Sequence, residues 1–262
     1  MTSRPVTCDV ADGIADVRLS RPEKRNALDG ATFAAIVAIG AELAADASIR
    51  AVVLSGEGKS FCAGLDMSLF GAMADANRSA DAVVSTLRDD AQRSVRLWGE
   101  LAAPVIAAVH GAAVGGGLQL ALGADIRIVA PDARLGALEI QWGIVPDMCG
   151  TQILPALVGP DVAKDLIFTG RIVRGDEALR IGLATRLSDD PRRDALALAR
   201  EIAGRNPDAI RVGKRLVDVA WAQTLDERIT TEQEWTSGLV GSEQQLAAVR
   251  ANFEAQRGDG GK

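Results

Sequence analysis

Short apolar segments alternate with helical segments over residues 1–190, and this alternation constrains the fold more than any other feature of the sequence. An apolar run of about four to eight residues bounded by turn residues is typical of a buried strand. Strands that alternate with helices indicate a sheet joined by crossovers. The expected strands cover residues 7–10, 14–19, 51–54, 105–109 and 125–129, and the expected helices begin near residues 29, 81 and 117. We therefore predict an α/β core over residues 1–190, followed by a helical region over residues 191–262.

The composition argues against several classes of function. The net charge is −6 and the sequence has no long block of Lys and Arg. Binding to nucleic acids or membrane surfaces, which relies on clustered positive charge, is therefore not expected. No apolar run approaches the roughly 20 residues needed to cross a bilayer. The first five residues lack the apolar stretch of a signal peptide, so we expect a cytoplasmic protein. The three cysteines have no CxxC or Cys/His spacing, which favours reduced thiols over disulfides or a metal site.

The scarcity of histidine and tyrosine narrows the chemistry further. The sequence contains one histidine, His110, and no tyrosine. A Ser-His-Asp or Cys-His apparatus would have to use His110. This residue follows an apolar strand, where a turn residue is expected. We therefore expect carboxylates to carry out any proton transfer.

Three loops carry the remaining functional signals: residues 21–28, 60–67 and 110–119. The third contains Gly115-Gly116-Gly117 directly before a helix. Glycines let a ligand approach the backbone, and amides from two such loops could converge on one developing oxyanion. Taken alone, these glycines favour a tight turn with close packing of helix on strand. Neither the GxGxxG spacing of dinucleotide sites nor the GK[ST] ending of a phosphate-binding loop is present, so no nucleotide cofactor is indicated.

Taken together and in order, segments along nearly the whole chain resemble the crotonase (enoyl-CoA hydratase/isomerase) family. The matching segments are RPEKRNAL at 21–28, FCAGLD at 61–66, AVHGAAVGGGLQLAL at 108–122, ADIR at 124–127, GIVP at 143–146, TGR at 169–171 and GLA at 182–184. The resemblance implies a spiral of ββα units with a C-terminal helical oligomerisation region, assembled as a homotrimer or a dimer of trimers. It also implies an acyl-CoA thioester as substrate, with no cofactor beyond the coenzyme A that the substrate carries.

The resemblance assigns roles to individual residues as well. It implies that the backbone amides of Ala63 and Gly116 form an oxyanion hole for the thioester oxygen. Residues expected to contact the coenzyme or the acyl group are Lys24, Arg25, Ala27, Leu28, Phe61, Leu65, Asp66, Gly115, Gln119 and Trp142. Lys24 and Arg25 could meet the phosphates of the coenzyme, although solvated surface positions explain them equally well.

The acid and base decide the reaction. Hydratases of this family have two glutamates, and the second matches Glu139, whereas the position of the first is occupied by Gln119. A glutamine can orient water but cannot accept or return a proton at neutral pH. The sequence therefore favours double-bond isomerisation with Glu139 as acid and base; the alternatives are hydration, or acyl-CoA binding without catalysis. Asp147 matches the catalytic aspartate of the family's dienoyl-CoA isomerases, or is simply a turn residue after Pro146.

Overall fold

A six-stranded sheet forms the centre of the molecule in the computed structural model, which describes residues 4–69 and 80–259. Its order is β1-β2-β3-β4-β6-β9. The strands are β1 (Val6–Ala11), β2 (Ile14–Leu19), β3 (Ala51–Gly56), β4 (Val105–Val109), β6 (Ile126–Val129) and β9 (Arg186–Leu187). β1 and β2 form an antiparallel hairpin, and the other neighbours pair in parallel. The five strands predicted from the sequence are confirmed, and the predicted α/β core with them.

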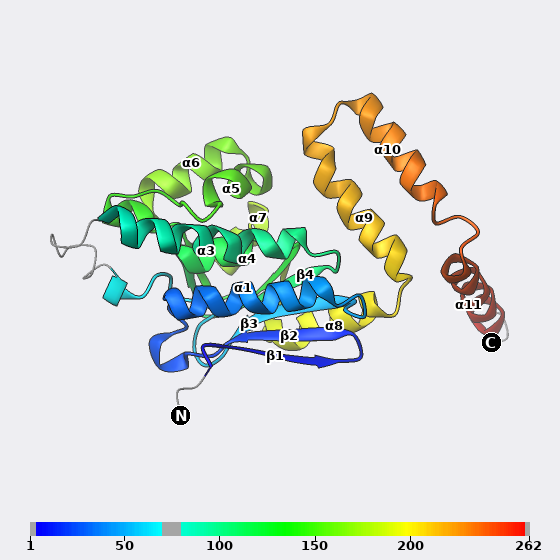
Figure 1. The fold of residues 1–262 in the computed structure, drawn as a ribbon, viewed down its shortest axis with the longest axis horizontal. Helices are drawn as coiled ribbons and strands as arrows, with labels where there is room; N and C mark the ends of the chain where they lie inside the picture. Colours follow the sequence, from blue (N-terminus) through cyan, green and yellow to red (C-terminus); the bar gives the residue numbers. More distant parts are fainter. Residues whose placement is uncertain (1–3, 70–79, 260–262) are drawn as a thin grey trace.

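Helices cover both faces of this sheet (Figure 1). On one face lie α1 (Gly30–Ala45) and α3 (Ala80–Glu100), where the buried side chains Phe33, Ile36 and Trp98 belong to the larger apolar core. The other face is covered by α8 (Pro191–Ala203), whose Ala195 and Leu198 pack against a second apolar cluster from β2, β3, β4 and β6. Asp29 caps α1, because its carboxylate accepts a hydrogen bond from the Thr32 amide.

A second, three-stranded sheet lies beyond the carboxyl ends of β3 and β4. It has the order β5-β7-β8 and was not predicted, because its strands are too short to show a pattern. Its strands are β5 (Ala112–Val114), β7 (Arg134–Gly136) and β8 (Val173–Arg174). The surrounding helices are α4 (Gly116–Leu122), the 3-10 helix η2 (Glu139–Trp142), α5 (Gly150–Val158), α6 (Pro160–Thr169) and α7 (Gly175–Arg180).

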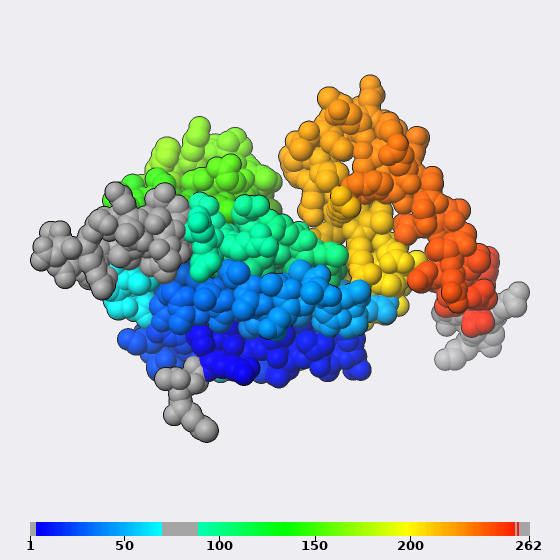
Figure 2. Space-filling model, in the orientation of Figure 1, coloured from blue at the N-terminus to red at the C-terminus, as the bar shows by residue number. Residues whose placement is uncertain are grey.

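The chain ends in a helical arm that stands away from the core (Figures 1 and 2). It comprises α9 (Pro207–Val219), the 3-10 helix η3 (Ala220–Ala222), α10 (Leu225–Ser237) and α11 (Glu243–Asp259). The helical region was predicted to start at residue 191, but α8 packs on the sheet, so the arm itself begins with α9. Several large apolar side chains of the arm are exposed, among them Trp221, Val240 and Phe253.

Cationic side chains attach α9 to the core. Lys214 forms an ion pair with Asp125, at 2.9 Å between Nζ and Oδ2. The same nitrogen donates to the carbonyl oxygens of Trp98, in the last turn of α3, at 3.1 Å and of Ala103, after that helix, at 3.3 Å. Arg211 donates to the Ala47 carbonyl oxygen, just after α1, at 2.6 Å. Cations are favourable at such positions because carbonyl oxygens at a helix C-terminus lack intrahelical partners.

Within the described part of the chain, no helix is long and apolar enough to span a membrane.

Candidate active site

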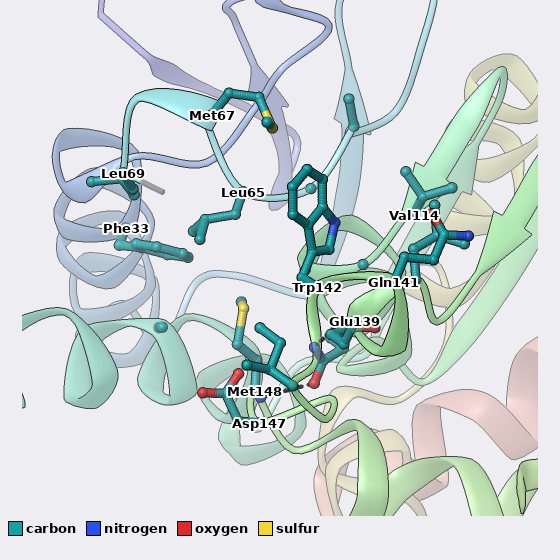
Figure 3. A pocket seen from close by; sticks show the side chains of 18 residues that line it. Phe33, Leu65, Met67, Leu69, Val114, Glu139, Gln141, Trp142, Asp147 and Met148 are labelled. Atoms are coloured by element: carbon teal, nitrogen blue, oxygen red, sulfur yellow. Dashed lines mark hydrogen bonds between the residues drawn. The ribbon is translucent and has the colours of Figure 1, made fainter. Parts of the chain in front are cut away.

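A cavity of about 290 Å³ lies beyond the carboxyl ends of β3 and β4 (Figure 3). It is lined by parts of the segments 63–69, 114–119 and 138–148, together with Phe33 of α1 and Ala91 of α3. In the view of Figure 3, Leu65, Met67 and Trp142 lie in the upper part of the cavity. Glu139 and Asp147 lie in its lower part. The walls are therefore mostly apolar, with two carboxylates gathered on one side.

The loop after β3 brings several backbone amides to this cavity, and some of them are already engaged. The Ala63 amide donates a hydrogen bond to the Arg25 carbonyl oxygen at 3.0 Å. The amides of Gly64 and Asp66 are also engaged, by a thiol and by a carbonyl oxygen. The Leu65 amide has no acceptor among the described residues. The prediction that Ala63 supplies an oxyanion donor is therefore wrong for this geometry, and Leu65 replaces it as the candidate.

The second predicted donor, Gly116, is the first residue of α4. Its amide likewise has no acceptor within the described ranges. The loop after β3 lies close by, since a Cβ built on Gly64 would lie 3.7 Å from the Gly116 nitrogen. Leu65 and Gly116 thus present free amides from neighbouring segments of one cavity. An oxyanion hole requires this arrangement, although the role of Gly116 stays a prediction.

The two segments meet at Gly117 and Cys62. A Cβ on Gly117 would lie only 2.3 Å from the Cys62 carbonyl oxygen, so only glycine permits this approach. The Cys62 thiol is fully buried and donates to the Asn26 carbonyl oxygen at 3.1 Å. Burial raises the pKa of this thiol to about 12. Cys62 is therefore a packing residue at neutral pH rather than a nucleophile.

We expect Gly117→Ala to lower the free energy of unfolding by about 1–3 kcal/mol, the range for inserting a methyl group into a packed site. The added carbon would force the loop after β3 away from α4. Urea denaturation measures the change. Gly213→Ala is the matched control, because a Cβ there meets nothing within 4 Å, and alanine in a helix interior should preserve or raise stability. Equal stability of the two variants would contradict the close packing.

Glu139 and Gln119 form a buried pair on the floor of the cavity. Their side chains are joined by a hydrogen bond of 2.7 Å from Gln119 Nε2 to Glu139 Oε1. Glu139 is 6% exposed and Gln119 is 1% exposed. Burial is the main cause that raises the pKa of Glu139, and the nearby Asp147 charge acts in the same sense, against the Gln119 hydrogen bond. The structure thus brings Gln119 and Glu139 together as the resemblance implies.

Asp147 lines the same cavity but is exposed to solvent. Its backbone carbonyl oxygen accepts a hydrogen bond of 3.0 Å from Gln92 of α3, which helps to hold the turn in place. The two acids therefore differ in environment, one being buried and the other solvated.

Of the other residues assigned to substrate binding, some line the cavity and others are buried. Gly115 and Trp142 line the cavity. Phe61, Leu28 and Ala27 are buried, with Phe61 and Leu28 in the apolar core. Their side chains support the loops, so any contact with substrate would come from their backbone.

The charged residues of the first two loops lie in different environments. Lys24 and Arg25 are exposed on the surface, outside the cavity lining. Asp66 instead forms an ion pair with Arg21, at 3.0 Å between Oδ2 and Nη2, and accepts two further hydrogen bonds from Ser68. Asp66 therefore fastens one loop to the other instead of facing the cavity.

Asn26 holds these loops together, a role that sequence reasoning missed. Its buried Nδ2 lies within 3.2 Å of the carbonyl oxygens of Glu57, Ser60 and Phe61. Its Oδ1 accepts from the Arg21 amide at 2.9 Å. Asn26 has a φ of 58°, a conformation that asparagine adopts more readily than most residues. An asparagine between polar and apolar loop residues is the only signal that the sequence offers for this role.

His110 lies outside the lining of the cavity. It follows β4, and its Nε2 lies 3.0 Å from the Gly58 carbonyl oxygen. The interpretation of His110 as a residue at the end of a strand is confirmed. In the part of the chain that the structure describes, no group of three or more His, Cys, Asp or Glu side chains is placed to hold a metal ion.

Comparison with known proteins identifies the family. Residues 9–256 match the family described as Enoyl-CoA hydratase/isomerase. The chain belongs to this family. It is 35% identical to the short-chain-enoyl-CoA hydratase of Clostridium acetobutylicum, covering 95% of this chain and 94% of the relative. It is 31% identical to the mitochondrial Delta(3,5)-Delta(2,4)-dienoyl-CoA isomerase of Mus musculus, covering 92% and 76%.

Solved structures of the enoyl-CoA hydratase/isomerase family share the fold. The enoyl-CoA hydratase of Bacillus anthracis superposes with a TM-score of 0.88 at 30% identity, covering 96% of each chain. The relatives thus include both a hydratase and an isomerase at similar identity. Family membership makes an enzyme of unsaturated acyl-CoA thioesters the expected class, and the choice of reaction rests on the residues of the cavity.

Proposed function

We propose that the protein isomerises the double bond of an unsaturated acyl-CoA, with Glu139 as the acid and base. One observation carries the proposal: the buried Glu139 has an amide, Gln119, as its hydrogen-bonded neighbour instead of a second carboxylate. One carboxylate suffices for a double-bond shift, because the same group removes a proton and returns it.

The proposed reaction begins from a 3-enoyl thioester. The Glu139 carboxylate removes a proton from C2, and the C–H electrons form a dienolate whose charge rests on the thioester oxygen. The amides of Leu65 and Gly116 donate to this oxygen. The protonated Glu139 then returns the proton at C4, which leaves the double bond between C2 and C3 and regenerates the carboxylate. The raised pKa of Glu139 supports this role, since a stronger base removes a carbon-bound proton more readily.

Hydration is the second candidate, favoured by the similarity to the Clostridium acetobutylicum hydratase. Gln119 would then orient the water, and Glu139 would have to serve both as base and as acid. Hydration is less favoured than isomerisation because the Gln119 side chain cannot return a proton at neutral pH.

The surroundings of the cavity support the remaining parts of the proposal. The mostly apolar walls suit an apolar acyl group. Lys24 and Arg25, exposed near the loops, are candidates to meet the phosphates of the coenzyme. We further propose that no cofactor is needed and that the protein is a cytoplasmic homotrimer or dimer of trimers. The exposed apolar side chains of the arm support such association.

Three thioesters test the proposal: crotonyl-CoA, a 3-enoyl-CoA and a 3,5-dienoyl-CoA. We expect conversion of the 3-enoyl substrate to its conjugated isomer, with slow or absent hydration of crotonyl-CoA. Hydration as fast as isomerisation would contradict the assignment. Binding of all three without turnover would favour a non-catalytic acyl-CoA-binding protein.

The role of Asp147 is tested with the same substrates. If Asp147 is a second acid, Asp147→Asn should abolish turnover of the dienoyl substrate and preserve that of the 3-enoyl substrate. Asp189→Asn is the control, because Asp189 is also exposed but lies between β9 and α8, outside the cavity lining. Equal dienoyl turnover in both variants would leave Glu139 as the single acid.

A further inference from the structure

The orientation of the Gln119 side-chain amide is fixed by its neighbours. Its Oε1 accepts two backbone hydrogen bonds, from Met148 at 2.8 Å and from Gly150 at 2.9 Å. Both donors are N–H groups, so the oxygen must face them and the Nε2 group must face Glu139. The flipped orientation would place two N–H donors against the NH₂ group. The chain therefore determines this amide orientation without ambiguity.

This orientation makes the two oxygens of Glu139 unequal. Oε1 accepts the Gln119 hydrogen bond, whereas Oε2 is buried and has no hydrogen-bond partner among the described residues. A buried carboxylate oxygen without a partner is costly, and such atoms gather at functional sites. Gln119 therefore holds the carboxyl group through Oε1 alone, and no donor among the described residues holds Oε2.

The turn that carries Asp147 is built on the same amide. Met148 and Gly150, which donate to Gln119, directly follow Asp147, and Cys149 between them has a φ of 70°. A Cβ on Gly150 would lie 2.8 Å from Gln119 Oε1, so the turn closes tightly over this oxygen. One end of the amide thus holds Glu139, and the other end holds the turn next to Asp147.

We propose that Gln119 is a positioning residue that fixes the orientation of the Glu139 carboxyl group and sets the placement of Asp147 relative to it. The inference deepens the proposed function and rests on it for the identity of the substrate. The position of this side chain would then govern which reaction the pair of acids supports. Among the described residues, Asp147 is the charged group that acts on Glu139.

Two variants separate the two functions of the Gln119 side chain, which are donation to Glu139 through Nε2 and acceptance from Met148 and Gly150 through Oε1. Gln119→Glu keeps an oxygen for the Met148 and Gly150 amides but replaces the Nε2 donor by a second carboxylate oxygen. Gln119→Met, of similar size, removes both functions. The readout is the titration of Glu139 in the protein without substrate, followed by carboxyl ¹³C NMR and assigned with Glu139→Gln.

In Gln119→Glu we expect Glu139 to titrate about one pH unit or more above the wild type, because two adjacent carboxylates then share a proton. The melting temperature should stay close to that of the wild type. Gln119→Met should also raise the titration of Glu139, through loss of the donor, and should lower the melting temperature, through two unsatisfied amides. An unchanged Glu139 titration in both variants would overturn the proposal.

A measurement on the wild type covers the case in which the variants do not fold. One Gln119 side-chain N–H should exchange slowly with solvent while Glu139 is ionised, and rapid exchange of both would overturn the proposal. The NMR readouts need no substrate. A wild type that turns over none of the thioesters but shows the predicted titrations would therefore reject the proposed function and retain the role of Gln119.

Discussion

Replacing Glu139 by glutamine is expected to lower kcat by about 10²–10⁴-fold, the usual contribution of a general acid or base. Glutamine keeps the size and the hydrogen-bonding capacity of the side chain but cannot carry the proton from C2 to C4. Binding of the thioester should change little, since the apolar walls and the amides of Leu65 and Gly116 are untouched. Steady-state kinetics with the 3-enoyl thioester and calorimetric binding measure the two quantities.

The control for this variant is Glu42→Gln, because Glu42 is an exposed residue of α1 outside the cavity lining. It should retain the activity of the wild type. Comparable activity in Glu139→Gln and Glu42→Gln would contradict the role of Glu139 as acid and base. Loss of binding in Glu139→Gln would instead indicate that Glu139 shapes the cavity without taking part in proton transfer.

The raised pKa of Glu139 gives the same variant a signature in stability. Below about pH 4.3 an ordinary glutamate is protonated in the unfolded chain, and Glu139 is then protonated in both states. As the pH rises, the unfolded chain loses the proton first, so burying the charge increasingly penalises the folded state. Glu139→Gln should therefore be more stable than the wild type at neutral pH. Urea denaturation should show that the stability difference between Glu139→Gln and the wild type vanishes as the pH falls from neutral to about 4.3.

Replacing Lys214 by methionine is expected to lower the free energy of unfolding by about 3 kcal/mol, as when one partner of a buried ion pair is removed. The Lys214 side chain is 8% exposed, and its partner Asp125 is 23% exposed. Loss of the ammonium group also leaves Asp125 near Asp218, whose pKa is already raised by burial and then by the Asp125 charge. The carbonyl oxygens of Trp98 and Ala103 lose a donor at the same time.

Urea denaturation and limited proteolysis measure the effect of this variant. Cleavage between α8 and α10 should accelerate, because Lys214 attaches α9 to the core. Lys164→Met on α6 is the matched control, since Lys164 is exposed. If both variants unfold at the same urea concentration, the attachment of α9 does not depend on Lys214.

The sequence predicts those elements whose pattern is long enough to read. The strands at 51–54 and 105–109 are apolar throughout and sit in the middle of the sheet, so they stand out. β8 and β9 have two residues each, too few for any periodicity. Their pairing depends on partners distant in the sequence, as between Val173 and Leu135.

In the candidate site, too, local sequence patterns predict some features, whereas contacts between distant residues determine the others. The glycines at 115–117 indicate that a backbone amide could face a ligand, but not which amides stay free. That depends on the parallel pairing of Leu28 with Leu65, which leaves the Leu65 amide on the cavity side, and on the Arg25 carbonyl oxygen that takes the Ala63 amide. The contacts of Gln119 with Met148 and Gly150 lie 29 and 31 residues apart in sequence, beyond any local pattern.

The burial of Cys62 gives the molecule a built-in reporter of the separation of its active-site loops. Cys8 and Cys149 are half-buried, whereas Cys62 is enclosed between the Asn26 loop and α4. An alkylating reagent should therefore label Cys62 in the native protein only when these segments part. In a Cys8→Ala, Cys149→Ala background, the labelling rate would count opening events, and an acyl-CoA analogue that bridges Leu65 and Gly116 should slow it.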